Sequence, residues 1–299
     1  MNIWVPLEIG MTMGLIMFFA VLALATAYRL FDFPDLTIEG SFLFGAVGFA
    51  VLQKAGFGYL GSLAGALTLG AAAGTLTGFL YARFRINKFL TGILVTAIVY
   101  SLSLRLMAGP NLGLLAVSTA LDDSLASLGL VDSGTAKILA LILISVGVGI
   151  GLVVLMSSRY GLRWRVSGSN PQYAQVLGIG LITSSMLALA TTNVLAALSG
   201  TLLAVHQGFA DVGLGGGMLI IALASMSIGD RLLSERRLSV PVFVVVSSLI
   251  GSIVYQTVVA FAVSAGLNPV DLKLITALLV LVVLVTRHKS SDDPLTERN

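Results

Sequence analysis

The sequence contains no cysteine and has little charge. The absence of cysteine excludes disulfide bonds, cysteine-ligated metal sites and thiol catalysis. Only 10% of the 299 residues are charged, with 17 lysines and arginines and 14 aspartates and glutamates. A soluble domain uses about 25% charged residues to cover a surface that faces water. We therefore expect this chain to be dissolved in a lipid bilayer.

The sequence also lacks the common motifs of energy conversion and catalysis. It has no GxxxxGK[ST] loop for binding phosphate. His206 has no second histidine at a metal-binding spacing, and no nucleophile, acid and base form a catalytic pattern. We predict no catalytic residue, no metal ligand and no cofactor bound by this chain, so the protein is not expected to be an enzyme. The net charge of +3 lies in short loops and does not indicate nucleic-acid binding.

Long apolar runs are abundant. Hydrophobic residues make up 57% of the chain, and the mean hydropathy is +1.01. Since about 20 apolar residues cross a bilayer, seven runs predict membrane-spanning helices: 7–27, 59–81, 89–108, 135–157, 180–205, 241–265 and 271–286. Two shorter runs, 36–53 and 206–229, are interrupted by polar residues and glycine. The expected fold is all-α, a single transmembrane bundle of 8–9 spans over residues 1–299. Its 33 glycines predict closely packed helices.

Lysine and arginine mark the cytoplasmic side of membrane proteins, and here they are unevenly distributed. If the chain crosses nine times, Arg29 falls on one side together with twelve others that lie in four segments: Arg83, Arg85, Lys88, Arg159, Arg163, Arg165, Arg231, Arg236, Arg237, Arg287, Lys289 and Arg298. The loop 109–134 contains aspartates but no lysine or arginine. We predict an N-terminus outside the cell and a cytoplasmic tail at 287–299.

The stretch RLFDFPDLTIEGSF, residues 29–42, places Asp32, Asp35 and Glu39 directly after the first long apolar run. A charge inside a bilayer costs a few kcal/mol and marks a functional candidate; the alternative is a solvated turn. We expect Asp35 to cap the following half-helix, where the helix dipole favours an anion. Glu39, one turn further on, is expected on the same face, towards a substrate pathway, a dimer partner or a hydrogen bond on a neighbouring helix.

A second interrupted stretch, VHQGFADVGLGGGMLI, covers residues 205–220. Paired interrupted helices of opposite direction indicate inverted repeats that line a substrate path. Asn193 lies within an apolar span, so it either faces this path or forms a helix-to-helix hydrogen bond. The predicted pathway residues are Asp35, Thr37, Glu39, Ser41, Asn193, His206, Gln207 and Asp211.

Residues 158–178, SRYGLRWRVSGSNPQYAQVLG, form a polar segment between two spans. The order Ser169-Asn170-Pro171 predicts a polar N-cap followed by proline at the first helical position. A two-turn helix is expected to follow and to end at Gly178. Such a helix is either an ordinary loop helix or one that docks onto a soluble partner.

Four blocks carry a resemblance to a known family: DFPDLTIEGSF, RINKFLTGILVTAIVYSLSLRLM, GLRWRVSGSNPQYAQVLGI and ALSGTLLAVHQGFADVGLGGGMLIIALASMSIGD. Together they resemble permease subunits of bacterial ABC importers, within the branched-chain amino-acid and ribose permease superfamily. The similarity runs from about residue 10 to 285 and is strongest to the group assigned to tryptophan or other amino acids. Ribose-type members read D-L-S-V-G-S at the first block, so Glu39 is an extra acid that argues against a sugar.

The resemblance implies an importer permease for a small organic solute, foremost an amino acid, in the bacterial inner membrane. It implies a homodimeric or paired permease, two cytoplasmic subunits that use ATP and Mg, and an extracytoplasmic substrate-binding protein. It also implies that the segment 158–178 couples to the ATPase through Gly168, Ser169, Asn170, Pro171, Ala174, Leu177 and Gly178. The alternative is an ion-coupled secondary transporter that uses Asp35, Glu39 or Asp211.

The predicted orientation can be measured with topology reporters. A reporter fused after Asn299 is expected to be active as a cytoplasmic fusion, because the basic loops hold the C-terminal side inside. One inserted beside Asp123, in the loop without lysine or arginine, is expected outside. Reversed signals would contradict the orientation.

Overall fold

The computed structural model describes residues 3–114, 133–233, 238–267 and 274. The helices are α1 (Trp4–Leu30), α2 (Thr37–Lys54), α3 (Gly58–Phe84), α4 (Lys88–Met107), α6 (Ser133–Ser157), α7 (Arg159–Ser169), α8 (Pro171–Val176), α9 (Leu181–Gln207), α10 (Met218–Leu232) and α11 (Val240–Ser264). A 3-10 turn η1 (Val212–Gly215) precedes α10, and two short strands are β1 (Asn111–Gly113) and β2 (Phe209–Asp211). The expected span 271–286, apart from Leu274, and the tail 287–299 lie outside the described residues.

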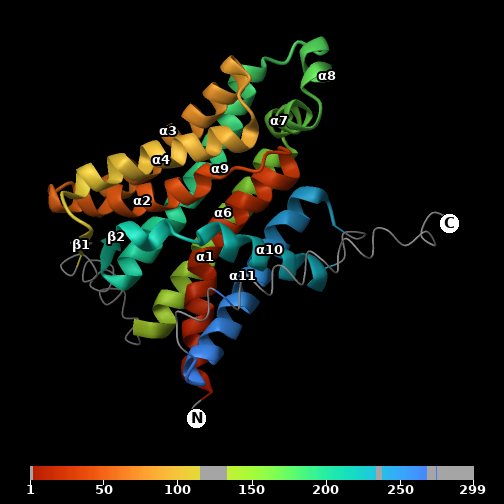
Figure 1. The fold of residues 1–299 in the computed structure, drawn as a ribbon. Helices are drawn as coiled ribbons and strands as arrows, with labels where there is room; N and C mark the ends of the chain where they lie inside the picture. The colour runs from red at the N-terminus through yellow and green to blue at the C-terminus, as the bar shows by residue number, and fades with distance from the viewer. Residues whose placement is uncertain (1–2, 115–132, 234–237, 268–273, 275–299) are drawn as a thin grey trace.

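The all-α prediction is confirmed. Within the described residues, 7 helical stretches are long and apolar enough to cross a membrane. Figure 1 shows α2, α3 and α4 side by side, while α1 and α11 run together through the lower part of the molecule. The strands β1 and β2 pair antiparallel, with Asn111 opposite Asp211.

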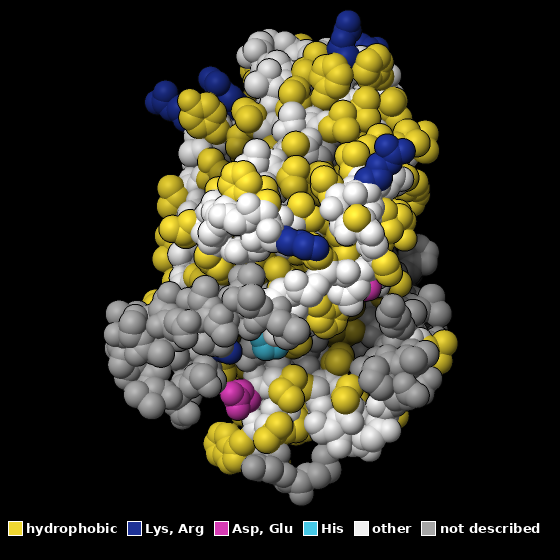
Figure 2. All heavy atoms as spheres, turned by 90° about the vertical axis from the view of Figure 1, so that its left-hand side faces the viewer, with side chains coloured by type: hydrophobic (Ala, Val, Ile, Leu, Met, Phe, Trp, Pro, Cys, Tyr) yellow, Lys and Arg dark blue, Asp and Glu magenta, His cyan; other side chains and the backbone are white. Residues whose placement is uncertain are grey.

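The helices differ in how far they are enclosed by protein. In α1, 83% of the most apolar 18-residue stretch is buried inside the protein, whereas in α6 only 17% of the corresponding stretch is buried. The exposed side of α6 consists of large apolar residues such as Leu143 and Val154, and apolar side chains cover much of the flank of the molecule (Figure 2). The helix α1 therefore lies in the interior, and α6 presents its apolar surface to lipid.

Glycines allow the inner helices to approach each other. A Cβ on Gly200 of α9 would lie 1.8 Å from the carbonyl oxygen of Phe42 on α2. A Cβ on Gly229 of α10 would lie 1.9 Å from the carbonyl oxygen of Ser247 on α11. Both distances are far below van der Waals contact, so only glycine fits. The prediction that glycine serves close helix packing is confirmed at these contacts.

The described basic loops lie together at one end of the molecule, which we call the basic end. Arg29 at the end of α1 forms a salt bridge with Asp230 at the end of α10. Asp32 lies 3.4 Å from the amine of Lys88 at the start of α4. Phe31 stacks edge-on against Trp164 of α7. These contacts place the ends of α1, α3 and α10, and the α7–α8 segment, at the same end.

The helix α7 was not predicted from the sequence, which indicated only a polar segment ahead of the short helix at Pro171. The hydroxyl of Ser158 caps its start by accepting a hydrogen bond from the Gly161 amide at 3.4 Å. Trp164 is buried, and a Cβ on Gly168 would lie 2.0 Å from the Phe31 carbonyl oxygen. Packing against the end of α1 thus stabilises a helix that its basic composition alone did not indicate.

Candidate functional site

The helix α2 begins inside the protein, beside a completely buried carboxylate. Asp35 has no exposed surface. One of its oxygens accepts a hydrogen bond from the Thr37 amide at 2.9 Å. The other accepts one from the side-chain amide of Asn193 at 2.7 Å. The predicted role of Asp35 at the start of this helix is therefore confirmed, because it pairs one of the amides that a helix N-terminus leaves free.

Asn193 lies near the midpoint of α9 and connects this carboxylate to other polar side chains. Its side-chain oxygen accepts a hydrogen bond from the hydroxyl of Ser41 at 2.6 Å. Beside them, the hydroxyls of Thr37 and Thr77 are 2.8 Å apart. All five side chains are buried. We call Asp35, Thr37, Ser41, Thr77 and Asn193 the buried polar cluster; it joins α2, α3 and α9.

The sequence indicated four members of this cluster but not Thr77. That threonine stands in GTLTG, between glycines that pack against α9. A lone hydroxyl in an apolar helix is common, because it can donate a hydrogen bond to a backbone carbonyl of its own helix. The Thr77 hydroxyl donates such a bond to the Ala73 carbonyl oxygen at 3.0 Å. Only the fold shows that it faces Thr37.

Glu39 faces a different helix from Asp35. Its carboxylate accepts a hydrogen bond from the Gly217 amide at 3.1 Å, directly before α10. Gly217 has a φ of 87°, a left-handed conformation that glycine adopts without strain. The expectation that both acids share one face is wrong, because Asp35 precedes the helix and turns towards α9. The expected hydrogen bond of Glu39 to a neighbouring helix is confirmed.

The two interrupted segments therefore meet at their starts. Gly215 of η1 also packs against the Glu39 backbone, since a Cβ there would lie 3.0 Å from its carbonyl oxygen. From this junction α10 runs to the basic end, where Asp230 meets Arg29. The helix α2 runs to the other end, where Phe49 stacks on Tyr59 at the start of α3. Their opposite directions agree with the expectation, while inverted repeats stay a prediction.

The other three candidate pathway residues lie apart from the buried polar cluster. His206 and Gln207 are exposed in the last turn of α9, about 20 Å along that helix from Asn193 at 1.5 Å per residue. Asp211 is half-buried, and its carboxylate accepts a hydrogen bond from the Gly213 amide at 2.6 Å. Among the described residues, no group of three metal-ligating side chains comes together. The eight candidates thus do not form one site: four lie in the buried polar cluster, Glu39 lies at the start of α10, and three lie at the end of α9 and in β2.

The short helix α8 has the predicted caps. The side chain of Asn170 accepts a hydrogen bond from the Tyr173 amide at 2.9 Å, and Pro171 occupies the first turn. Gly178 has a φ of 72°, a left-handed conformation that ends the helical turn. The chain continues from there into α9, which begins at Leu181.

The two faces of α8 differ sharply in exposure. Ala174 is completely buried beneath the helix. Val176 is 83% exposed, Leu177 53% and Tyr173 55%. We call these three side chains the apolar face of α8. Of the apolar residues expected to couple to a partner, Leu177 is available on this face, whereas Ala174 and Gly168 hold α8 and α7 against the rest of the chain.

We expect the buried polar cluster to be required for folding. Asp35→Ala leaves the Thr37 amide and the Asn193 side chain without their acceptor, and each unpaired buried donor costs about 1–3 kcal/mol. The yield and the thermal unfolding temperature of the detergent-purified protein should both fall. The control is Asp32→Asn, whose side chain is 72% exposed. Equal stability of the two variants would contradict the role of Asp35.

A second series separates hydrogen bonding from charge at Glu39. Glu39→Gln keeps an acceptor for the Gly217 amide but removes the anion at the start of α10, which is worth about 0.3–1 kcal/mol. Glu39→Leu removes both. The expected order of thermal stability is wild type, then Glu39→Gln, then Glu39→Leu. Identical stability of all three would show that this carboxylate does not hold the start of α10.

Comparison with known proteins agrees with this architecture. Residues 7–285 match the family described as branched-chain amino acid transport system / permease component. The chain is 32% identical over 276 residues to the tyrosine transport system permease protein of Clostridioides difficile (strain R20291), covering 92% of this chain and 89% of that one. It is 30% identical over 272 residues to an uncharacterised protein of Rickettsia prowazekii (strain Madrid E), covering 91% and 94%. No solved structure matches it. The chain belongs to the family of permease components of branched-chain amino acid transport systems.

Proposed function

We propose that this chain is the permease subunit of an ABC importer for an amino acid, and that α8 couples it to a separate ATPase. The observation that carries this proposal is the apolar face of α8. Three adjacent apolar side chains project at the basic end, on a helix whose other side is fixed by Ala174. A capped helix with such a face suits docking into a groove of a soluble protein.

The need for a partner follows from the sequence. The chain has no phosphate-binding loop, so ATP that drives transport has to be hydrolysed by another polypeptide. The described basic loops lie at the same end as α8, and basic loops face the cytoplasm. A cytoplasmic ATPase therefore approaches the end at which α8 projects. Two permease copies, two such ATPase subunits and an extracytoplasmic binding protein complete the proposed importer in the bacterial inner membrane.

An amino acid is the proposed substrate. The family description names branched-chain amino acid transport, and the relative from Clostridioides difficile is named for tyrosine. Tyrosine is therefore the first amino acid to test. In this importer, the junction between α2 and α10 lies along the substrate path, because interrupted helices that meet inside a membrane offer polar groups to a solute.

The rival proposal is an ion-coupled transporter, in which a buried acid binds and releases the coupling ion. Asp35 is the most deeply buried acid among the described residues. Both of its oxygens accept hydrogen bonds, from Thr37 and from Asn193, and these bonds join α2 to α9. This arrangement favours a structural role for Asp35, and so it favours the importer.

Coupling is tested by placing a charge on the apolar face of α8. Leu177→Glu should leave the permease folded, since the side chain is half exposed. Binding-protein-stimulated ATP hydrolysis by the assembled transporter should fall about tenfold or more, because a desolvated unpaired charge costs several kcal/mol in an interface. Leu162→Glu on α7 is the matched control, because Leu162 is 51% exposed and Leu177 53%.

Two outcomes would contradict the proposal. One is normal stimulated ATP hydrolysis in Leu177→Glu. The other is tyrosine uptake that continues after ATP depletion and stops only when the ion gradient is collapsed, which would support the rival.

Ala174→Glu tests folding and not coupling. It places a charge beneath α8 and should reduce the amount of folded protein.

A further inference from the structure

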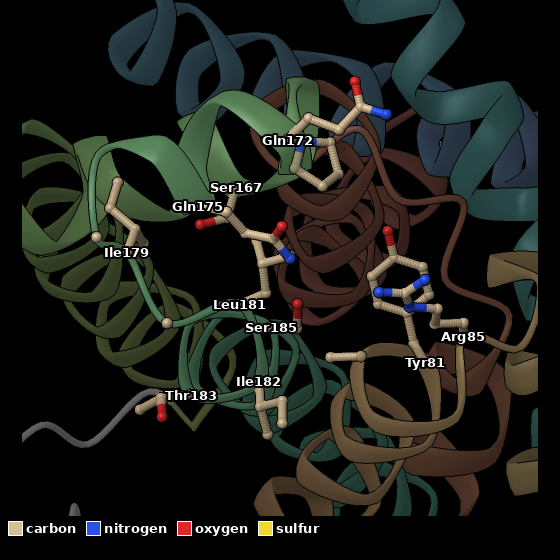
Figure 3. Close-up of a pocket in the computed structure, with 14 residues that line it drawn as sticks. Tyr81, Arg85, Ser167, Gln172, Gln175, Ile179, Leu181, Ile182, Thr183 and Ser185 are labelled. Carbon is tan, nitrogen blue, oxygen red and sulfur yellow. The ribbon is translucent and has the colours of Figure 1, made fainter.

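A cleft lies at the basic end beside α8. It has a volume of about 890 Å³ and is bounded by the end of α3, by α8 and by the start of α9. This volume is within the range of about 300–1,000 Å³ that small-molecule sites occupy. Figure 3 shows Gln175 on one side of the space, with Tyr81 of α3 and Arg85, which directly follows α3, on the other. Neither the buried polar cluster nor the apolar face of α8 contributes to it.

The charge of the cleft is of one sign. Arg85 is the sole ionised side chain among the fourteen residues that line it, and no aspartate or glutamate is among them. Within the described part of the chain, the guanidinium of Arg85 has no hydrogen-bond or salt-bridge partner. A guanidinium presents paired donors that match a carboxylate. The cleft therefore favours an anionic group next to Arg85.

The remaining lining is mixed. Half of the fourteen residues carry polar side chains, including Gln172 and Gln175 from α8, and the rest include Ile179, Leu181 and Ile182. The side-chain amides of both glutamines also lack partners among the described residues, and their oxygens can accept hydrogen bonds from an ammonium group. A single small molecule with a carboxylate, an ammonium and a modest apolar body matches these walls. Long acyl chains match them poorly.

We propose that this cleft binds a free amino acid, with its carboxylate on Arg85 and its ammonium on the glutamine amides. The choice of an amino acid rests on the proposed function; the cleft itself supplies the anion preference and the size. Because α8 forms one wall and α3 another, the ligand links the proposed coupling helix to the membrane-spanning bundle. The site thus binds the amino acid on the cytoplasmic side, to which the importer delivers it.

The test measures amino-acid binding to the full-length permease alone, in phosphatidylcholine nanodiscs, by calorimetry. L-tyrosine and the other common amino acids are compared with their carboxamides, which lack the carboxylate. At least one amino acid should bind, and its carboxamide should bind about tenfold more weakly or worse, as loss of a charge-assisted pair predicts. Arg85→Gln should weaken binding to a similar extent, and Gln175→Leu by a smaller factor.

Arg83→Gln is the matched control, because Arg83 is an exposed arginine at the same end of α3 that does not line the cleft. It should bind like the wild type. Absence of amino-acid binding, equal binding by the carboxamide or unchanged binding in Arg85→Gln would overturn the proposal. An Arg85-dependent gain in thermal stability that follows added phosphatidylglycerol, and no amino acid, would overturn it in favour of a lipid site.

These results are independent of the coupling test. Arg85-dependent binding together with normal stimulated ATP hydrolysis in Leu177→Glu would support the cleft proposal and contradict the proposed coupling role of α8. If Leu177→Glu loses stimulated ATP hydrolysis as expected but the permease alone binds no amino acid, the cleft proposal is contradicted and the importer proposal still stands.

Discussion

The structure depends on the burial of one carboxylate inside the membrane-spanning bundle. An ion in hydrocarbon is costly unless hydrogen bonds replace its hydration. Asp35 accepts one bond from the backbone of α2 and one from Asn193 at the middle of α9. These bonds permit α2 to begin in the interior, and they determine which face of α2 meets α9. The glycine contact between Gly200 and Phe42 then brings the two helices together.

The position of α2 in turn sets the second junction. Because α2 begins at depth, Glu39 lies beside the glycine-rich start of α10 and accepts the Gly217 amide. An anion at a helix start is favoured by the helix dipole. Two interrupted helices that leave this point in opposite directions place polar backbone inside the bundle. The outer helices, such as α6, present apolar surface to lipid and do not depend on buried carboxylates of this kind.

The basic end has a different character. There, α7 packs on the end of α1 through Trp164 and Gly168, and this contact supports α8 at the surface. One side of α8 is held by the rest of the chain at Ala174, and its other side exposes the apolar face on which the proposed coupling rests. The cleft proposed to bind an amino acid lies beside α8, with Arg85 on the opposite wall.

The sequence by itself determined the all-α class, the main spans, the grouping of the basic loops, the caps of α8 and the role of Asp35. These follow from hydropathy, charge and local hydrogen bonding, which act over a few residues or a bilayer thickness. The tertiary structure decided that Glu39 meets Gly217, that Thr77 faces Thr37, that Ala174 is buried and that His206 lies far from Asn193. Those contacts join residues distant in the chain, and helical periodicity shows which face a residue occupies but does not name the helix opposite it.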